Sequence, residues 1–208
     1  MLVSQTVLTT VRQTQAAILC LLGALVAPAQ QVDLGGLDTS GHTTVDGHST
    51  PYLIRRLPVN AFPQLPPAIQ AQLNERGCLI PQTYEAHRPE NVVNASLEHR
   101  GSSDWAVLCS VKGTVSLLVF FSGSASEPTV LASAPETSRL QAHGAGSVLG
   151  FNWGIDPATP EEIHEAQLNM HRPPQRPDHD GIADSVVEGR TIYRFCSHGT
   201  WTILDTED

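Results

Sequence analysis

One acidic run is the part of the sequence closest to a catalytic pattern. Glu161, Glu162 and Glu165 are carboxylates of the kind that glycosidases use in pairs. His164 and Glu165 begin an H-E-x-x-H pattern, but Leu168 stands where the second zinc-binding histidine would be needed. The sequence has no G-x-S-x-G, G-x-G-x-x-G or Walker loop. Because acids in the first turn of a helix already have a structural role, these residues do not predict an enzyme, and an unrecognised hydrolase stays an alternative.

The tryptophans are the other candidates for a functional role. Trp105, Trp153 and Trp201 each lie at a spacing typical of strands, where packing in the core is the usual role of the ring. A tryptophan exposed beside Asp104 or Asp184 would instead form a platform for a glycan or a peptide. We therefore keep the three rings as possible binding aromatics.

The chain opens with what we interpret as a cleavable signal peptide, residues 1–29. Arg12 precedes an uninterrupted run of apolar and small residues, Ala16–Ala27. Small residues then stand at the two positions read by signal peptidase, which places the cut before Gln30. The apolar run is shorter than the roughly 20 residues of a membrane-spanning helix. We expect an exported protein, periplasmic or extracellular, with no stable membrane span after cleavage.

The charge of the chain excludes some classes of partner. The formal net charge is −9 at pH 7, and loss of Arg12 with the signal peptide makes it more negative. Nucleic acids and anionic membranes both require a basic face on the protein. We therefore expect no nucleic-acid partner, and we expect an unknown protein or a glycan of the cell envelope instead.

Three cysteines remain after cleavage: Cys78, Cys109 and Cys196. In an oxidising compartment one pair is expected to form a disulfide, and the sequence allows three pairings. A metal site of Cys and His is not supported, because no C-x-x-C or H-x-x-x-H spacing occurs.

The sequence divides into a tether and a single domain. Residues 30–57 are rich in Gly, Ser, Thr, Asp and Gln and show no hydrophobic period, which predicts a flexible segment. Residues 58–208 are numerous enough to form one domain with its own core.

The domain is predicted to contain strands joined by short turns, with two short helices. Lys112-Gly113 predicts a tight hairpin between strands at 104–111 and 114–122. Pro67 and Gly77 bound a helix at 67–76, and Thr159 caps a helix at 159–170. Other strands are predicted at 91–97, 127–132, 147–154, 183–188, 191–196 and 200–204, with a loop at 133–146. The fold class is therefore α+β, with a largely antiparallel sheet of hairpin units.

Two segments resemble each other, 101–123 and 180–201. In both, a Gly is followed three residues later by an Asp, then by a strand, a Gly-containing turn and a second strand with a Phe. Such an internal repeat favours two hairpin units side by side in one sheet.

The start of the second copy resembles the end of the D-x-D-x-D-G-x-x-D loop of FG-GAP or VCBS-type repeats. The resemblance implies that Asp178, Asp180 and Asp184 are the third, fifth and ninth positions of a calcium loop. The first position falls on Arg176, so that any Ca²⁺ site would be weak. The alternative is a turn in which the Asp side chains accept hydrogen bonds from backbone N–H groups.

Residues 58–208 also resemble a family of exported bacterial proteins that has no assigned activity. The segments that carry the resemblance are Arg76–Gln82, Asn91–Val93, Asp104–Ser110, His179–Ile182 and Gly199–Trp201. The resemblance implies that Cys78 and Cys109 form the disulfide and that Cys196 is the free thiol. Such a bond would join the end of a helix to the hairpin and contribute on the order of 3 kcal/mol.

Three hypotheses follow. The first is an exported, non-catalytic domain with a binding or structural role in the cell envelope. The second is a domain weakly stabilised by calcium, and the third is an unrecognised hydrolase.

Overall fold

The computed structural model describes residues 37–123, 127–144, 148–168, 170 and 173–205. The predicted signal peptide, 1–29, and the first part of the predicted tether, 30–36, lie outside these residues. Within the described part of the chain, no helix is both long and apolar enough to cross a membrane.

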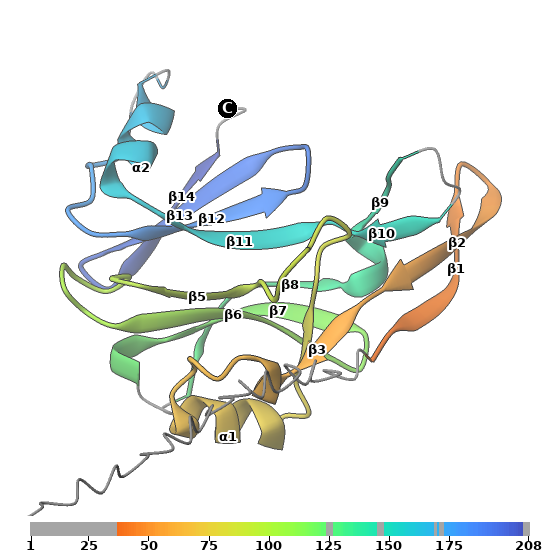
Figure 1. The fold of residues 1–208 in the computed structure, drawn as a ribbon. Helices are drawn as coiled ribbons and strands as arrows, with labels where there is room; N and C mark the ends of the chain where they lie inside the picture. The colour runs from red at the N-terminus through yellow and green to blue at the C-terminus, as the bar shows by residue number, and fades with distance from the viewer. Residues whose placement is uncertain (1–36, 124–126, 145–147, 169, 171–172, 206–208) are drawn as a thin grey trace, which may run out of the picture. The chain divides into compact units, whose positions relative to one another are not determined.

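The described chain forms three β-sheets and two short α-helices (Figure 1). All pairs of strands are antiparallel except β2 with β10.

The central sheet has the order β3-β4-β6-β7-β8, with β5 paired to β6: β3 (Arg56–Pro58), β4 (Leu79–Pro81), β5 (Val92–Ala95), β6 (Asp104–Val111), β7 (Thr114–Phe120) and β8 (Thr129–Pro135). The hairpin sheet has the order β1-β2-β10-β9: β1 (Thr39–Val45), β2 (His48–Ile54), β10 (Leu149–Phe151) and β9 (Leu140–Ala142). The C-terminal sheet runs from β11 to β14 in chain order: β11 (Trp153–Ala158), β12 (Gly181–Val186), β13 (Thr191–Ser197) and β14 (Thr200–Asp205). The helices are α1 (Pro67–Glu75) and α2 (Pro160–Gln167), and short 3-10 turns lie at Val59–Ala61, Phe121–Gly123 and Glu136–Ser138. The predicted fold class is confirmed.

The central hairpin β6–β7 forms as predicted. Lys112 and Gly113 both have positive φ, 51° and 82°, which is the geometry of the two-residue turn that follows the twist of the strands. Trp105 and Cys109 face one side of β6, and Leu108 faces the other. Each side meets its own buried cluster, so the central sheet is covered on both faces. This explains why β6 and β7 are almost continuously apolar.

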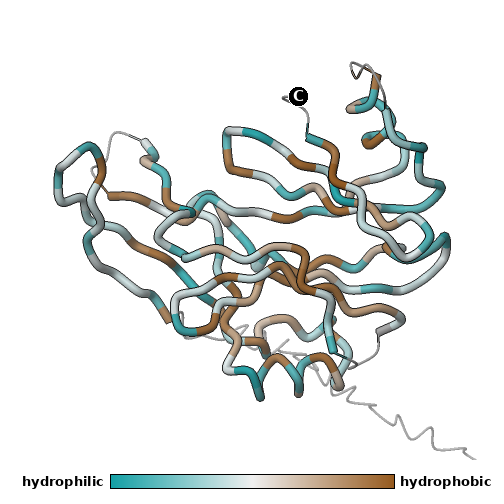
Figure 2. The backbone as a smooth tube through the Cα atoms, turned by 180° about the vertical axis from the view of Figure 1, so that it is seen from behind, coloured by the Kyte–Doolittle hydropathy of each residue, from teal (hydrophilic) through white to brown (hydrophobic). Residues whose placement is uncertain are grey.

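Helix α1 covers one face of the central sheet. It buries Ile69 and Leu73 in a cluster with Trp105 and Phe120 of the sheet. The other face packs on a second cluster that contains Trp153 of β11. Figure 2 shows the hydrophobic segments gathered in these central strands. The core is therefore built on both sides of β6 and β7.

A disulfide joins Cys78, just after α1, to Cys109 in β6. The two Cα atoms are 5.4 Å apart and the cysteines are separated by 31 positions in the sequence. Cys196 is buried and has a free thiol. The pairing implied by the family resemblance is confirmed.

Part of the predicted tether forms regular strands. The flexible tether was placed at 30–57, but β1, β2 and β3 occupy Thr39–Pro58. Asp46-Gly47 forms the turn between β1 and β2, with positive φ at both residues. The ring of Tyr52 lies over Gly41 so closely that a Cβ on Gly41 would come 2.7 Å from the tyrosine oxygen. Cross-strand packing of this kind orders a segment whose composition alone is typical of a linker.

Other boundaries differ through tertiary pairing. The predicted loop 133–146 contains the end of β8 and all of β9. The predicted strand 147–154 is interrupted at Asn152, and its halves β10 and β11 belong to two different sheets. The two similar segments do not lie side by side in one sheet. The first forms β6–β7 of the central sheet, and the second forms β12–β13 of the C-terminal sheet.

Helix α2 begins as predicted but ends earlier, at Gln167. The Thr159 hydroxyl accepts a hydrogen bond from the Glu162 N–H (3.2 Å), and a Glu162 carboxylate oxygen accepts one from the Thr159 N–H (2.7 Å). This reciprocal pair is a capping box. The helix buries Ile163 in a cluster with Phe195 and Leu204 of the C-terminal sheet.

Candidate functional site

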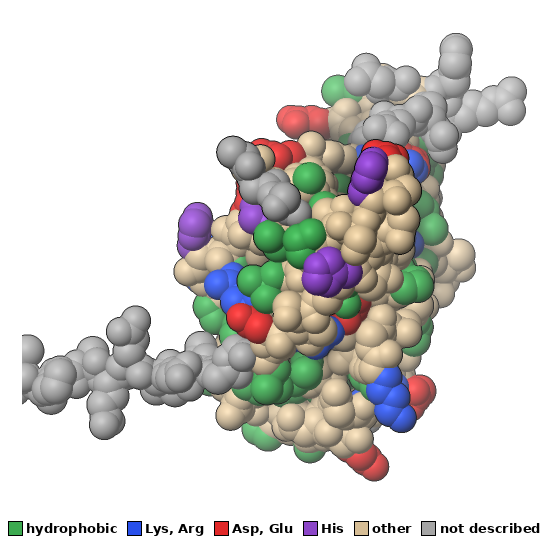
Figure 3. All heavy atoms as spheres, turned by 90° about the vertical axis from the view of Figure 1, so that its right-hand side faces the viewer, with side chains coloured by type: hydrophobic (Ala, Val, Ile, Leu, Met, Phe, Trp, Pro, Cys, Tyr) green, Lys and Arg blue, Asp and Glu red, His purple; other side chains and the backbone are tan. Residues whose placement is uncertain are grey.

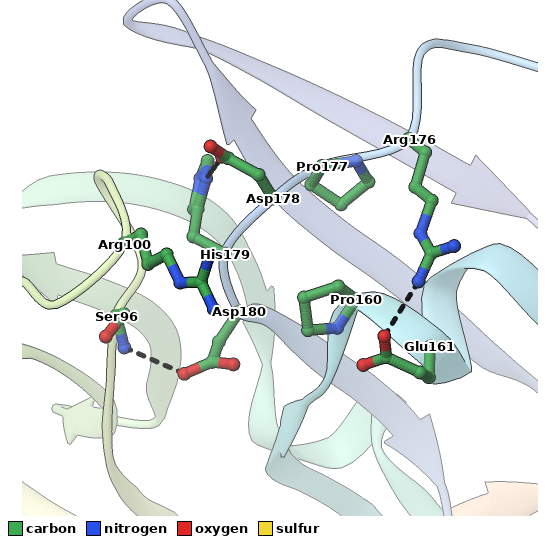
Figure 4. Close-up of a pocket in the computed structure, with 9 residues that line it drawn as sticks. All are labelled: Ser96, Arg100, Pro160, Glu161, Arg176, Pro177, Asp178, His179 and Asp180. Atoms are coloured by element: carbon green, nitrogen blue, oxygen red, sulfur yellow. Dashed lines mark hydrogen bonds and ion pairs between the residues drawn. The ribbon is translucent and has the colours of Figure 1, made fainter.

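A pocket of about 550 Å³ lies where three distant segments of the chain meet (Figure 4). We call it the Asp178–Asp180 pocket. Its walls come from the loop after β5, the start of α2 and the segment that leads into β12. The described lining residues are Ser96, Arg100, Pro160, Glu161, Arg176, Pro177, Asp178, His179 and Asp180.

A buried carboxylate fixes the loop after β5. Asp104, at the start of β6, is fully buried. One of its oxygens accepts hydrogen bonds from the N–H groups of Leu97 (2.9 Å) and Glu98 (2.8 Å) and from the Ser102 hydroxyl. The other accepts one from the Ser122 N–H (2.6 Å). These donors satisfy the buried charge, and the loop that carries Ser96 and Arg100 is held in place.

Asp180 links this loop to the segment before β12. One of its carboxylate oxygens accepts a hydrogen bond from the Ser96 N–H (3.1 Å), across 84 positions of sequence. In Figure 4 Arg100 and Asp180 extend into the same space. This hydrogen bond therefore joins two walls of the pocket.

His179 is the most unusual group in the pocket. Its side chain is 7% exposed, and its Nδ1 lies 2.9 Å from the Asp178 carboxylate. The Asp178 carboxylate accepts a hydrogen bond from the Nδ1–H of His179. Nε2 is buried and has no hydrogen-bond partner among the described residues. The bond from His179 lowers the pKa of Asp178, so that this exposed carboxylate stays ionised.

The rim of the pocket carries charges of both signs. The Arg176 guanidinium lies 2.8 Å from a Glu161 carboxylate oxygen, and their side chains are 45% and 73% exposed. The Asp178 side chain is 84% exposed. The pocket thus presents guanidinium donors and carboxylate acceptors close to one another.

The third predicted calcium ligand, Asp184, is not in this pocket. It lies in β12 opposite Ile155 of β11 and is buried. Its Oδ1 accepts a hydrogen bond from the Trp153 Nε1–H (2.6 Å), and its Oδ2 accepts one from the Arg194 Nε–H (2.7 Å). Its oxygens already serve a buried network. Among the described residues no group of three or more His, Cys, Asp or Glu could hold a metal ion.

The predicted binding aromatics are largely core residues. Trp105 is buried against α1, and Trp153 is completely buried beneath the Arg139 guanidinium, which lies 4.3 Å from its ring centroid. Trp201 is half-buried, and its ring centroid is 6.3 Å from that of Phe121. Packing, the usual role of such rings, accounts for Trp105 and Trp153.

Sequence reasoning singled out Asp178 and Asp180 but missed Ser96, Arg100 and His179. The segment 178–180 carried a signal, because two carboxylates flank a histidine just before a glycine. Ser96 and Arg100 carried none, since their role depends on a contact between distant segments.

Comparison with known proteins gave no match to a family model, to a curated protein or to a solved structure.

Proposed function

We propose that this chain is an exported, non-catalytic domain of the cell envelope and that the Asp178–Asp180 pocket binds a glycan. The observation that carries the proposal is the mixture of donors and acceptors on two facing walls of the pocket. Arg100 and Arg176 supply guanidinium N–H groups, and Asp178 and Asp180 supply carboxylate oxygens. A sugar hydroxyl both donates and accepts hydrogen bonds. Vicinal hydroxyls therefore match such a surface better than a purely cationic or purely anionic ligand does.

Two proline rings complete the fit. Pro160 and Pro177 line the same pocket and offer small apolar surfaces between the polar groups (Figure 4). Sugar rings also present apolar C–H faces between their hydroxyls. Small-molecule sites combine apolar lining with a few well-placed polar groups in this way.

Two titratable groups of the pocket are poorly suited to act as general acids. A general acid or base must reach the proton that it transfers. The Nε2 atom of His179 is buried away from solvent, and the lowered pKa of Asp178 keeps that carboxylate from donating a proton. The polar groups of the pocket are suited to hold a ligand.

Two features support export. The Cys78–Cys109 disulfide is typical of proteins that fold in oxidising compartments. The N-terminal sequence has the order of charge, apolar run and small residues that signal peptidase requires. Both agree with a working place in the cell envelope.

The test is calorimetric titration of the disulfide-bonded protein, purified after secretion, with soluble peptidoglycan fragments and chitin oligosaccharides. Arg100→Gln and Asp178→Asn each remove a charged hydrogen-bonding group, so each is expected to weaken binding about tenfold, equivalent to ~1.4 kcal/mol. Asp46→Asn, in the turn of the β1–β2 hairpin, removes one carboxylate outside the described pockets and should bind like the parent. Absence of binding to both glycan classes, or equal binding by all the variants, would refute the proposal.

A further inference from the structure

A pair of stacked rings lies on a different part of the molecule. Tyr84, in the loop after β4, stacks on His143, which follows β9, with ring centroids 4.4 Å apart and ring planes within 6°. We call this pair the Tyr84–His143 platform. Figure 3 views the molecule from the side of the hairpin sheet, where histidine and hydrophobic side chains emerge together on one surface.

The platform is held from beneath by strand β10. A Cβ on Gly150 would come 2.4 Å from the Tyr84 Cβ and 3.0 Å from the His143 Cδ2. The Tyr84 N–H also donates a hydrogen bond to the Phe151 carbonyl (2.9 Å). The missing side chain of Gly150 therefore provides the space in which both rings pack on the strand. A platform fixed in this way loses little conformational entropy when a ligand covers it.

Two hollows are lined by both rings of the platform, and a third adjoins one of them. One of about 560 Å³ is lined by Tyr84, Glu85, His87, His143, Gly144 and Glu188. A second, of about 530 Å³, shares Glu85 and Glu188 with it and reaches Glu90 and Asp156. A third, of about 510 Å³, shares Tyr84 and His143 with the first. Since the hollows share residues, an extended ligand could occupy them together.

Carboxylates gather on the side of the platform that faces Glu85 and Glu188, whereas Asp38 and Arg55 both line the hollow on its other side. The Tyr84 hydroxyl donates a hydrogen bond to Glu188 (3.3 Å), and burial, followed by the charges of Glu188 and Glu85, raises the pKa of Tyr84. Burial and then the charge of Glu90 raise the pKa of Asp156. Arg88 acts in the opposite sense on Asp156. Among the described residues that line the two hollows containing Glu188, none is Lys or Arg.

We propose that the Tyr84–His143 platform docks a basic segment of a partner protein, with an arginine side chain against the half-buried rings and its guanidinium beside Glu85 and Glu188. A guanidinium is attracted both by the face of an aromatic ring and by nearby carboxylates. The net charge of −9 steers a basic partner toward the protein. The inference does not depend on the glycan proposal, because the two sites share no lining residue.

The probe is a fluorescent peptide of alternating arginine and glycine, and its control replaces every arginine by citrulline, a neutral group of the same shape. Fluorescence anisotropy measures binding to the secreted, disulfide-bonded protein. We expect the arginine peptide to bind at least tenfold more tightly than the citrulline peptide, and its affinity to fall as salt screens the charges.

The variants separate charge from folding. The double substitution Glu85→Gln with Glu188→Gln should reduce arginine-peptide binding at least tenfold, and Tyr84→Leu should also reduce it. The double control Asp46→Asn with Glu165→Gln removes the same charge outside the described pockets and should bind like the parent. Tyr84→Phe keeps the ring and loses only the hydroxyl that bonds Glu188, so it should still bind the arginine peptide; loss of binding in this variant would contradict the assignment to the ring surface.

Three outcomes would overturn the proposal. Equal affinity for the arginine and citrulline peptides would exclude recognition of the cation. Equal loss in the double variant and in its matched control would assign the effect to net charge alone. Competition by a neutral oligosaccharide at the platform would show that the site takes a glycan instead.

Discussion

Replacing Asp184 by Ala tests whether this carboxylate is a structural group of the core. Asp184 accepts hydrogen bonds from Arg194 (2.7 Å) and from Trp153 (2.6 Å), and the side chains of Asp184 and Arg194 are 5% and 11% exposed. The substitution leaves a buried guanidinium without its counter-charge and a buried indole N–H without its acceptor. We expect a large loss of stability with no change in glycan binding.

The size of the loss follows from burial. Removing one partner of a buried ion pair costs about 3–5 kcal/mol, and an unpaired buried N–H costs about 1–3 kcal/mol. Because both penalties arise from one network, they do not add fully. We expect the free energy of unfolding to fall by about 4 kcal/mol, a large part of the total of about 5–15 kcal/mol for an ordinary domain.

The surface pair Arg176–Glu161 provides the matched control. Its atoms are 2.8 Å apart, nearly the same distance, but its side chains are 45% and 73% exposed. Arg176→Ala should therefore change stability by less than about 1 kcal/mol. Urea unfolding followed by tryptophan fluorescence measures both variants. Asp184→Asn, which keeps an acceptor for Trp153, should lose less than Asp184→Ala and remains measurable if the alanine variant does not fold.

A double substitution tests whether the loss of stability comes from the unpaired charge. Asp184→Leu with Arg194→Met removes both buried charges, and should recover most of the stability that Asp184→Ala loses, because apolar side chains often replace a buried pair without penalty. The explanation is refuted if Asp184→Ala and Arg176→Ala cost the same. It is also refuted if Ca²⁺ stabilises the parent protein and not Asp184→Ala, since that result would assign the carboxylate to an ion.

Three further predictions follow from the same structure. Cys78→Ser with Cys109→Ser should lower the free energy of unfolding by about 3–4 kcal/mol, as loop-closure entropy implies for the separation of 31 residues, and thermal melts measure the loss. Burial raises the pKa of the Cys196 thiol, so iodoacetamide at mildly alkaline pH should label it only after urea is added; rapid labelling of the native protein would contradict its buried position. Hydrogen bonds from the Thr159 backbone and hydroxyl lower the pKa of Glu162, so this stabilisation is present above the unfolded pKa and is lost as the pH falls through the folded value. Thr159→Ala should cost about 1 kcal/mol at neutral pH and should lose less on acidification than the parent, as urea titrations at several pH values would show.

Several elements could be predicted because their signals are local. Lys112-Gly113 specifies a hairpin turn through the backbone angles of two residues, and Thr159 specifies a helix start through a side chain that bonds three residues ahead. Gly77, with φ of 70°, ends α1 in the same local way. No distant part of the chain is needed to decide any of them.

The β1–β2 hairpin shows where local composition misleads. Asp46-Gly47 is a strong turn signal, but the flanking residues are small and polar, and they predicted a tether. What orders them is packing of Tyr52 across Gly41 and burial of Ile54 against the core. Such contacts depend on the register of two strands, and composition does not contain register.

The candidate site also contains residues that the local sequence predicted and residues that depend on tertiary contacts. The sequence by itself placed Asp178, His179 and Asp180 together and left the pairing of the cysteines open among three possibilities. Only the tertiary structure decided that Ser96 and Arg100 complete the pocket, because a contact across 84 positions brings them there. It also separated Asp184 from Asp180 despite their closeness in sequence. Pairing of Asp184 with Ile155 in the C-terminal sheet directs its carboxylate to Trp153 and Arg194 in the interior.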